Sequence, residues 1–311
     1  MILYCKNNKV YNIDTEEVYN VGLLPGLMKK NPCKETFKIW LKTRYSSNTN
    51  SLARRLKGIT FGQGNRVQIN KSTHILSLSD CYWVKNDDSN LLFEEVSPYY
   101  TDFWKGEGYY KDGNSIPTLY VSGYLNKEWI SSKYLNKYGD LDLEVEASLL
   151  CKKCDIPVCN ISKIQDGIQI ENFTDSNLML EQADQSGIID PDDFTEKDII
   201  SYMGMFGIQM LTIDAITGNG DRHAGNFGWL RNTDNGSYIS PAPLYDFDHV
   251  LDSKASNDRL IKDLLLSVKD TNNDNMINEV IKICNIVKSS ETNEIFKIRS
   301  NTTLSELGVR S

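Results

Sequence analysis

The chain has 311 residues, of which 40% are hydrophobic and 24% charged, and its formal net charge is −8. These proportions indicate an ordinary globular protein, and this length fills one large domain or two lobes with a cleft between them. The acidic excess argues against direct nucleic-acid binding, because affinity for a phosphate backbone needs clustered Lys and Arg. The sequence shows neither a secretory leader nor an apolar run long enough to cross a membrane, so we expect a cytoplasmic protein without a membrane partner.

Residues 1–105 are predicted to form an N-terminal extension or accessory subdomain of mixed structure. The pattern predicts a helix over residues 34–44, and strand-forming residues end the tract 76–84. We find no catalytic constellation in this region. Its simplest interpretation is a subdomain that packs on the rest of the chain or recruits a partner.

Residues 106–184 are predicted to form a β-rich nucleotide-binding lobe. Short β segments are expected around Gly123 and over residues 134–138, and a strand is expected to end near Glu181. Between them, apolar residues at helical spacing predict a helix with one buried face, made of Leu143, Ala147, Leu150, Cys151 and Cys154. A polar connector over residues 184–193 is the best candidate for a boundary between lobes.

Three of the seven cysteines, Cys151, Cys154 and Cys159, lie close together. A structural zinc site needs four ligands, and neither a second cysteine pair nor a histidine is nearby. Two of the three fall on the buried face of the predicted helix. We therefore expect buried free thiols in a reducing compartment rather than a zinc site.

Residues 185–311 are predicted to form a mostly helical catalytic lobe. The segment Thr195-Glu-Lys-Asp198 matches a helix-capping pattern, and apolar residues every three or four positions predict one helix that runs from there to Gly218. A buried helix of this kind would deliver the loop that starts at Asp221 to a fixed place. From residue 257 onward the pattern is that of amphipathic helices. The polar segment 270–275 lacks the Gly and Glu of a calcium loop, so we expect a turn there.

After the loop at Asp221, the pattern predicts a strand over residues 227–230, a turn over 232–236 and a returning strand over 238–245. Such a hairpin would bring Asn226 and Asp246 to its open ends, close enough to share one cation. An Asp and an Asn five residues apart, with a second Asp after a strand, is the equipment of a phosphotransferase. The alternative, in which Asp221 and Asn226 only stabilise a turn, does not account for the neighbouring Arg222 and His223.

The sequence Gly-Asp-Arg-His-Ala-Gly-Asn-Phe-Gly-Trp-Leu over residues 220–230, followed by Ala-Pro-Leu-Tyr-Asp over 242–246, resembles the catalytic and metal-binding segments of the HipA-like serine/threonine kinases. Similar elements occur in phosphoinositide lipid kinases. The resemblance implies an α+β, two-lobed, protein-kinase-like fold that binds ATP and Mg²⁺. It also implies that Asp221 is the catalytic base, within a catalytic segment that includes Arg222 and His223, and that Asn226 and Asp246 are metal ligands.

Lys137 resembles the family's strand lysine, which contacts the α- and β-phosphates of the nucleotide. The alternative is a solvated lysine on an edge strand. The lysine's helical partner is either Glu144 or Glu146, between which helical geometry does not choose. Similarity to the family's Glu-x-x-Ala-Ser pattern favours Glu144.

The segment from residue 121 to Lys127 occupies the place of the family's phosphate-covering loop. We expect backbone groups of Ser122 and Gly123 to approach the phosphates, with Lys127 assisting. The resemblance also makes Ser122 a candidate for autophosphorylation. Residues 178–182, including Glu181, would form the linker that binds adenine through its backbone.

One position departs from the pattern of many kinases, because Asp248 stands where they have Gly. Gly there lets the segment flip between states, so Asp248 should make it stiffer and favour a permanently assembled site. Asp248 could instead bind a second cation, or it could simply pair with His249.

We therefore expect a magnesium- and ATP-dependent kinase that acts on a Ser or Thr hydroxyl of a protein. The alternatives are a lipid or small-molecule kinase and a nucleotide-binding regulator without turnover. The resemblance further suggests a toxin of a toxin–antitoxin system, with an antitoxin as a possible partner. The sequence does not identify the phosphoacceptor or the oligomeric state.

Overall fold

The computed structural model describes residues 1–43, 74–101, 127–251 and 259–309. The chain forms two compact units, each built from segments that are distant in the sequence. Unit 1 comprises Met1–Gly139, Gln169–Gly187 and Trp229–Ser240, and unit 2 comprises Asp140–Ile168, Ile188–Gly228 and Pro241–Ser311. The sequence-based division at residues 105 and 184 stays a prediction.

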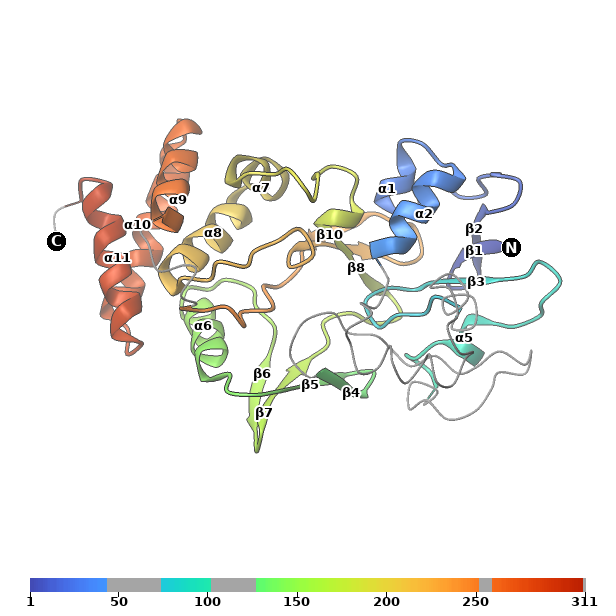
Figure 1. Cartoon of the computed structure of the whole chain (residues 1–311), viewed down its shortest axis with the longest axis horizontal. Coiled ribbons are helices and arrows are strands. Elements are labelled where there is room, and N and C mark those ends of the chain that lie inside the picture. The colour runs from blue at the N-terminus through green and yellow to red at the C-terminus, as the bar shows by residue number, and fades with distance from the viewer. Residues whose placement is uncertain (44–73, 102–126, 252–258, 310–311) are drawn as a thin grey trace. The chain divides into compact units, whose positions relative to one another are not determined.

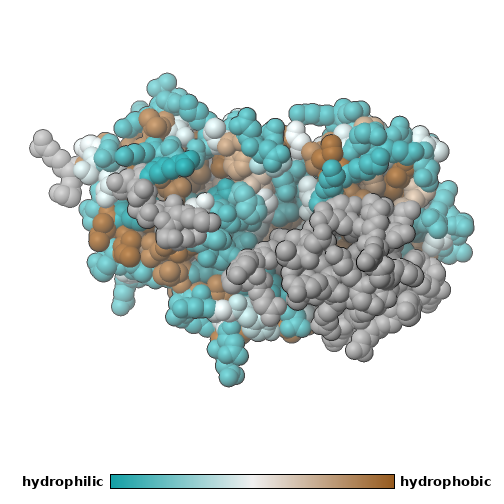
Figure 2. All heavy atoms as spheres, in the orientation of Figure 1, coloured by the Kyte–Doolittle hydropathy of each residue, from teal (hydrophilic) through white to brown (hydrophobic). Residues whose placement is uncertain are grey.

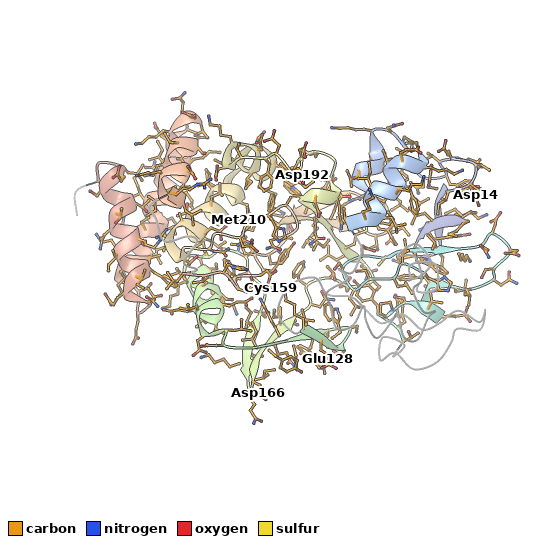
Figure 3. All side chains as sticks on the ribbon, viewed as in Figure 1. Asp14, Glu128, Cys159, Asp166, Asp192 and Met210 are labelled. Atoms are coloured by element: carbon orange, nitrogen blue, oxygen red, sulfur yellow. The ribbon has the colours of Figure 1, made fainter. Side chains whose placement is uncertain are left out.

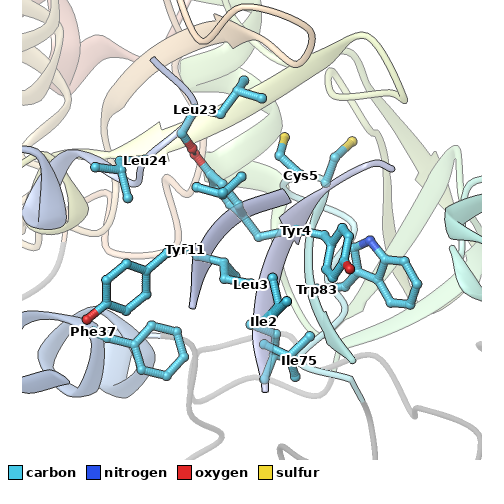
Figure 4. Close-up of a cluster of buried hydrophobic side chains, with 14 of the residues drawn as sticks. Ile2, Leu3, Tyr4, Cys5, Tyr11, Leu23, Leu24, Phe37, Ile75 and Trp83 are labelled. Carbon is cyan, nitrogen blue, oxygen red and sulfur yellow. The ribbon is translucent and has the colours of Figure 1, made fainter. Parts of the chain in front are cut away.

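Unit 1 begins with an antiparallel sheet of strand order β2-β1-β3. Its strands are β1 (Ile2–Cys5), β2 (Asn8–Asn12) and β3 (Tyr82–Lys85), and the helices of this part are α1 (Gly26–Lys29), α2 (Lys34–Thr43) and α5 (Phe93–Val96). Every residue of the central strand β1 is buried. Figure 4 shows the apolar cluster around this strand, in which Trp83 of β3 and Phe37 of α2 take part. The sequence predicted α2 and β3 but not the β1–β2 hairpin.

The remaining strands form two further sheets. One has the order β10-β9-β8, with β8 (Leu178–Gln182), β9 (Gly228–Asn232) and β10 (Tyr238–Pro241). The other has the order β4-β5-β7-β6, with β4 (Lys127–Ser131), β5 (Tyr134–Tyr138), β6 (Ile161–Ile164) and β7 (Gly167–Glu171). β4 and β5 pair antiparallel, with Lys127 opposite Lys137. The chain passes from unit 2 to unit 1 within β7, after Ile168.

Unit 2 is mostly helical. Its helices are α6 (Asp142–Lys153), α7 (Glu196–Met203), α8 (Met205–Thr217), α9 (Arg259–Asp270), α10 (Asp274–Ser289) and α11 (Glu294–Glu306). α8 lies at the centre, where it contacts each of the other five. Almost every residue of α8 is buried, including Met210, which Figure 3 labels. The turn predicted over residues 270–275 is confirmed as far as Asn273, which caps α10, whereas residues 274 and 275 already belong to that helix.

The single helix predicted from Thr195 to Gly218 is wrong in one respect, because the chain breaks it at Gly204. Gly204 has φ 61° and ψ −135°, a conformation that in practice only glycine adopts at low cost. The predicted start is confirmed by a capping box, in which the backbone N–H of Thr195 donates to Asp198 Oδ2 over 2.8 Å. The predicted end is also confirmed, since Gly218 closes α8 in the left-handed conformation with φ 67°.

The predicted hairpin after the Asp221 loop is present, but its second strand is shorter than predicted. Residues 232–236 form the turn, and the backbone N–H of Gly236 donates to the carbonyl of Asn232 over 2.9 Å. β10 ends at Pro241 instead of Tyr245. Beyond it the chain leaves the hairpin, and Leu244 makes an isolated parallel bridge with Val158. The bridge to Val158, and not the hairpin, therefore fixes the backbone two residues before Asp246.

All seven cysteines are free, and all except Cys33 are buried. Burial raises the pKa of the Cys154 thiol to about 11 and raises the pKa values of Cys151 and Cys159 still further. Zinc binds thiolates, which these groups do not form at neutral pH. The prediction of buried thiols at these three positions is confirmed.

The C-terminal helices of unit 2 carry several exposed apolar side chains, namely Leu266, Ile295 and Ile298. Figure 2 shows hydrophobic surface on these helices among hydrophilic residues. Scattered apolar side chains of this kind are normal on a protein surface. In the part of the chain that the structure describes, no helix combines the length and apolar character needed to cross a membrane.

Candidate active site

A buried ion pair fixes the start of the loop that contains Asp221. Arg222 donates from Nε to Asp214 Oδ2 over 2.9 Å and from Nη2 to Asp214 Oδ1 over 2.8 Å, and both side chains are at most 5% exposed. Burial by itself lowers the pKa of Arg222, but the charge of Asp214 outweighs this and leaves the pKa raised. Asn219 Nδ2 also donates to Asp214, over 2.8 Å. The loop is thereby anchored to the last turn of α8.

The same arginine joins the loop to the segment that contains Asp246. Its Nη1 donates both to the carbonyl oxygen of Asn226, over 2.9 Å, and to that of Tyr245, over 3.0 Å. Its guanidinium lies 5.1 Å from the centre of the Phe247 ring. The hydroxyl of Tyr245 donates to the carbonyl of Gly225 over 2.9 Å. One side chain therefore holds together the backbone at Asn226 and the backbone immediately before Asp246.

Within the loop, hydrogen bonds orient the individual residues. The carbonyl oxygen of Asp221 accepts from the backbone N–H of His223 over 2.9 Å and from Asn226 Nδ2 over 3.2 Å. His223 is exposed, and its Nδ1 accepts from the backbone N–H of Gly225 over 3.0 Å. The Asp221 side chain is 51% exposed. The backbone of Asp221 thus has a structural role, while its carboxylate is accessible.

Asp246 has an uncommon backbone conformation, with φ 59°. Asp is one of the few residues that tolerates the left-handed region, and such positions persist where the surroundings hold them. The next residue, Phe247, is buried, and its backbone N–H donates to Glu144 Oε1 over 3.4 Å. Glu144 itself is buried on α6. This contact places Glu144 beside the segment that carries Asp246.

The alternative residue, Glu146, is used elsewhere in unit 2. Its Oε1 accepts hydrogen bonds from the backbone N–H of Asn293 and from Thr292 Oγ1, the latter over 3.2 Å. Glu146 therefore caps the start of α11. The contacts favour Glu144 for a site role, although its pairing with Lys137 stays a prediction.

The predicted nucleotide-binding lysines lie in unit 1. Lys137 is fully buried in β5, which has a neighbouring strand on each side. The alternative of a solvated edge-strand lysine is therefore wrong. Lys127 lies directly across from it on β4. The structure thus brings the two lysines together, whereas Ser122 and Gly123 lie outside the described residues.

The side chain of Glu181 forms part of a buried polar cluster. Its Oε1 accepts from Arg231 Nη1 over 2.5 Å and from the backbone N–H of Gly26 over 2.8 Å, and its Oε2 accepts from the hydroxyl of Tyr238. Burial lowers the pKa of Arg231, but Tyr82 and Glu181 outweigh it and leave the pKa raised. The Glu181 carboxylate is committed to these bonds, so only its backbone is left for the predicted contact with adenine.

Asp184, which follows β8 in the short helix η2 (Ala183–Gln185), was not singled out from the sequence. Its Oδ1 is inaccessible to solvent and accepts no hydrogen bond from the described residues. Burial raises its pKa from 3.8 to about 7, although the backbone N–H groups of Asp184 and Gln185 partly oppose this. The carboxyl therefore keeps its proton to a higher pH than a solvent-exposed aspartate does.

This raised pKa predicts a pH-dependent stability of unit 1. Between pH 4 and pH 7 the folded chain binds more protons at Asp184 than the unfolded chain, so stability should fall as pH rises through this range and level off above it. Asp184→Asn should flatten the profile and raise the free energy of unfolding at pH 8 by about 2 kcal/mol. Urea unfolding at several pH values, followed by tryptophan fluorescence, measures this. Parallel profiles for the two proteins would contradict the assignment.

No family model matches the chain, and no curated protein matches it. Among solved structures, HipA of the toxin–antitoxin system HipA and HipB, in complex with its operator DNA, from Shewanella oneidensis MR-1 matches with a TM-score of 0.59. The match covers 98% of this chain and 96% of that chain, at 10% sequence identity. The chain has a HipA-like fold. The α+β fold expected from the resemblance to HipA-like kinases is thus confirmed.

A second solved structure, the proinflammatory kinase CtkA of Helicobacter pylori, matches with a TM-score of 0.36 and 17% identity. It covers 59% of this chain and 90% of that chain. A likeness at this level supports no inference about fold.

The residues of the HipA-like fold in unit 2 suit a hard cation such as Mg²⁺, which prefers oxygen ligands. Asn226 is buried, and its Nδ2 is bonded to the Asp221 carbonyl, so its amide oxygen Oδ1 is the atom that a cation would bind. Asp246 supplies a carboxylate from the adjoining segment. Arg222 holds the two backbones together, and this role was not foreseen from the sequence.

Proposed function

We propose that the chain is a kinase that uses ATP and Mg²⁺ to phosphorylate a Ser or Thr hydroxyl of a protein. The observation that carries the proposal is the double hydrogen bond from Arg222, which draws Asn226 and the Asp246 segment together while the Asp221 carboxylate stays accessible. A base, an amide oxygen and a second carboxylate are the groups that phosphoryl transfer requires. The HipA-like fold supports the same function.

Each residue has a distinct part in this proposal. Asp221 would accept the proton of the acceptor hydroxyl as the new bond to phosphorus forms. Asn226 and Asp246 would hold the magnesium ion, which when bound neutralises charge on the phosphates. Arg222 and His223 would position the loop, because their hydrogen bonds are to backbone groups of the loop itself. Lys127, Lys137 and the backbone at Ser122 and Gly123 would contact the nucleotide, with Glu144 as the partner of Lys137.

A cavity in unit 2 borders the same loop. It has a volume of about 410 Å³ and is lined in part by Asn219, Gly220 and Arg222, together with residues of α7, α8 and α9. Gly220 immediately precedes the proposed base. We propose that a side chain of the acceptor protein next to the phosphorylated residue enters this cavity.

The decisive experiment follows label from γ-labelled ATP into protein. Asp246→Asn should lower transfer at least about 100-fold, because the amide is a much weaker ligand for magnesium than the carboxylate. Asp166→Asn is the matched control, since Asp166 lies in the exposed turn between β6 and β7 (Figure 3). Equal transfer by both variants would reject the assignment.

The same assay separates the alternatives. Label that appears in lipid or in a small molecule, but not in protein, would indicate a kinase with another acceptor. Nucleotide binding without any transfer would indicate a regulator without turnover. Label on the chain itself, located at Ser122 by mass spectrometry, would establish autophosphorylation.

The HipA structure contains HipB and operator DNA. By analogy we propose that this chain has an antitoxin partner and acts as a toxin. The net charge of −8 does not favour direct binding of nucleic acid by the chain itself. Growth arrest on expression of the wild type but not of Asp221→Asn would support a toxin that depends on phosphotransfer.

A further inference from the structure

Asp221, Asp248 and His249 form a second group of potential metal ligands. His249 Nε2 lies 3.6 Å from Asp221 Oδ2 and 3.9 Å from Asp248 Oδ1. One ligand atom from each residue lies within 4.8 Å of the other two. Both of the histidine's distances exceed the 2.7–3.2 Å typical of an N–H···O hydrogen bond, so these contacts are not hydrogen bonds.

The spacing is close to that of three ligands around one ion. Zinc binds His nitrogen and carboxylate oxygen at roughly 2.0–2.2 Å, so two ligands of a tetrahedral site are about 3.4 Å apart. His249 Nε2 is within a few tenths of an ångström of this separation from both Asp221 and Asp248, and the two carboxylates have oxygens within 4.8 Å of each other. Rotation of the Asp221 and His249 side chains, which are the more exposed of the three, supplies this movement.

Backbone contacts hold the three residues in this arrangement. Phe247 is buried against the Arg222 guanidinium, and the backbone N–H of Val250 donates to the Phe247 carbonyl over 3.4 Å. Asp248 and His249 therefore lie in a turn that is fixed at Phe247, next to the loop of Asp221. The side chains of Asp221, Asp248 and His249 are 51%, 11% and 38% exposed. Solvent can reach the group, so an ion can enter and keep water on its remaining positions.

We propose that Asp221, Asp248 and His249 bind a divalent transition-metal ion such as Zn²⁺. These ligands differ from those proposed for magnesium, Asn226 and Asp246. An imidazole with two carboxylates suits zinc or its neighbours in the transition series, whereas magnesium prefers oxygen alone. Three protein ligands with an open position are also the usual composition of an accessible zinc site.

Occupation of this site has a consequence that rests on the proposed kinase function. An ion bound to the carboxylate of Asp221 withdraws the group that would accept the acceptor's proton. Zinc should therefore inhibit phosphotransfer, and His249→Gln should be less sensitive to zinc than the wild type. The binding site itself does not depend on kinase activity.

Binding is tested with the full chain, freed of metal and without nucleotide. Co²⁺ serves as the spectroscopic probe and Zn²⁺ as its competitor, and Cys33→Ser is introduced into every protein because Cys33 is the only cysteine that is not buried. One equivalent of Co²⁺ should bind, and the bound ion should show the visible absorption spectrum typical of cobalt with nitrogen and oxygen ligands. Asp248→Asn and His249→Gln should each weaken binding at least about 10-fold, whereas Asp166→Asn should leave it unchanged.

Three outcomes would overturn the proposal: no binding, a spectrum with thiolate charge-transfer bands, or equal affinity in all variants. Circular dichroism of each variant establishes that it is folded, and the two ligand variants test the site independently. If the chain binds the metal but transfers no phosphate, the metal-site proposal is supported and the proposed kinase function is rejected. If the chain transfers phosphate but binds no Co²⁺, the kinase function is supported and the metal-site proposal is rejected.

Discussion

Replacing Asp221 with Asn is expected to lower phosphotransfer by about 10²–10⁴-fold, the range that a positioned general base contributes. The amide is nearly the same size as the carboxylate but cannot take the acceptor's proton. The hydrogen bonds that shape the loop come from the backbone carbonyl of Asp221, which the substitution retains. Because the side chain is half exposed, stability should change by no more than about 0.5 kcal/mol.

The measurement is the rate of label transfer at saturating ATP and Mg²⁺, with the urea midpoint determined on the same preparations. Asp166→Asn again provides the control for loss of one exposed carboxylate. An Asp221→Asn protein that retains the wild-type rate would remove the base from the mechanism. A lowered urea midpoint together with the lowered rate would show that the variant loses activity because it unfolds.

Replacing Arg222 with Leu is expected to destabilise unit 2 by about 3–5 kcal/mol. The substitution leaves Asp214 buried without its counter-charge, and breaking a buried ion pair from one side has this cost. It also removes the bonds to the carbonyls of Asn226 and Tyr245. The double variant Arg222→Leu with Asp214→Leu should be more stable than the single one, because no isolated charge remains.

Circular dichroism of the helices is the suitable probe for this measurement, since every tryptophan among the described residues lies in unit 1. Lys163→Met is the matched control. It removes one side of the exposed ion pair with Asp142, whose side chains are 58% and 75% exposed, and should cost no more than about 1 kcal/mol. If Arg222→Leu cost as little as this control, the buried pair would not be what anchors the loop.

The parts of the structure that were predicted correctly carry local signals. The capping box at Thr195 and the left-handed Gly218 are each specified within a few residues, because a helix end must satisfy its own backbone groups. The hairpin was recognisable from its turn residues. The loop from Asp221 to Asn226 was identified because phosphotransfer requires particular residue types at fixed spacing, and its catalytic role stays a prediction.

The parts that were missed depend on contacts between distant residues. The break at Gly204 separates two helices that approach closely at Gly207. A Cβ on Gly207 of α8 would meet the carbonyl oxygen of Ile199 of α7 at 3.0 Å. The helical spacing of the apolar residues continues through Gly204, so the sequence pattern gives no sign of the break. Likewise, Arg231 and Glu181 are 50 residues apart, so no local pattern reveals that they pair. The contacts that distinguish Glu144 from Glu146 come from Phe247 and Asn293, which are also remote in sequence.

The shared hydrogen bonds of Arg222 have a consequence for regulation. A guanidinium group is rigid and planar, so the two carbonyls that it binds from one nitrogen cannot separate without losing a bond. The loop and the segment after it must consequently shift as a single body, anchored to the end of α8. In the proposed kinase, regulation by moving one metal ligand out of place is therefore disfavoured, and we expect regulation to act on the entry of the nucleotide or of the acceptor.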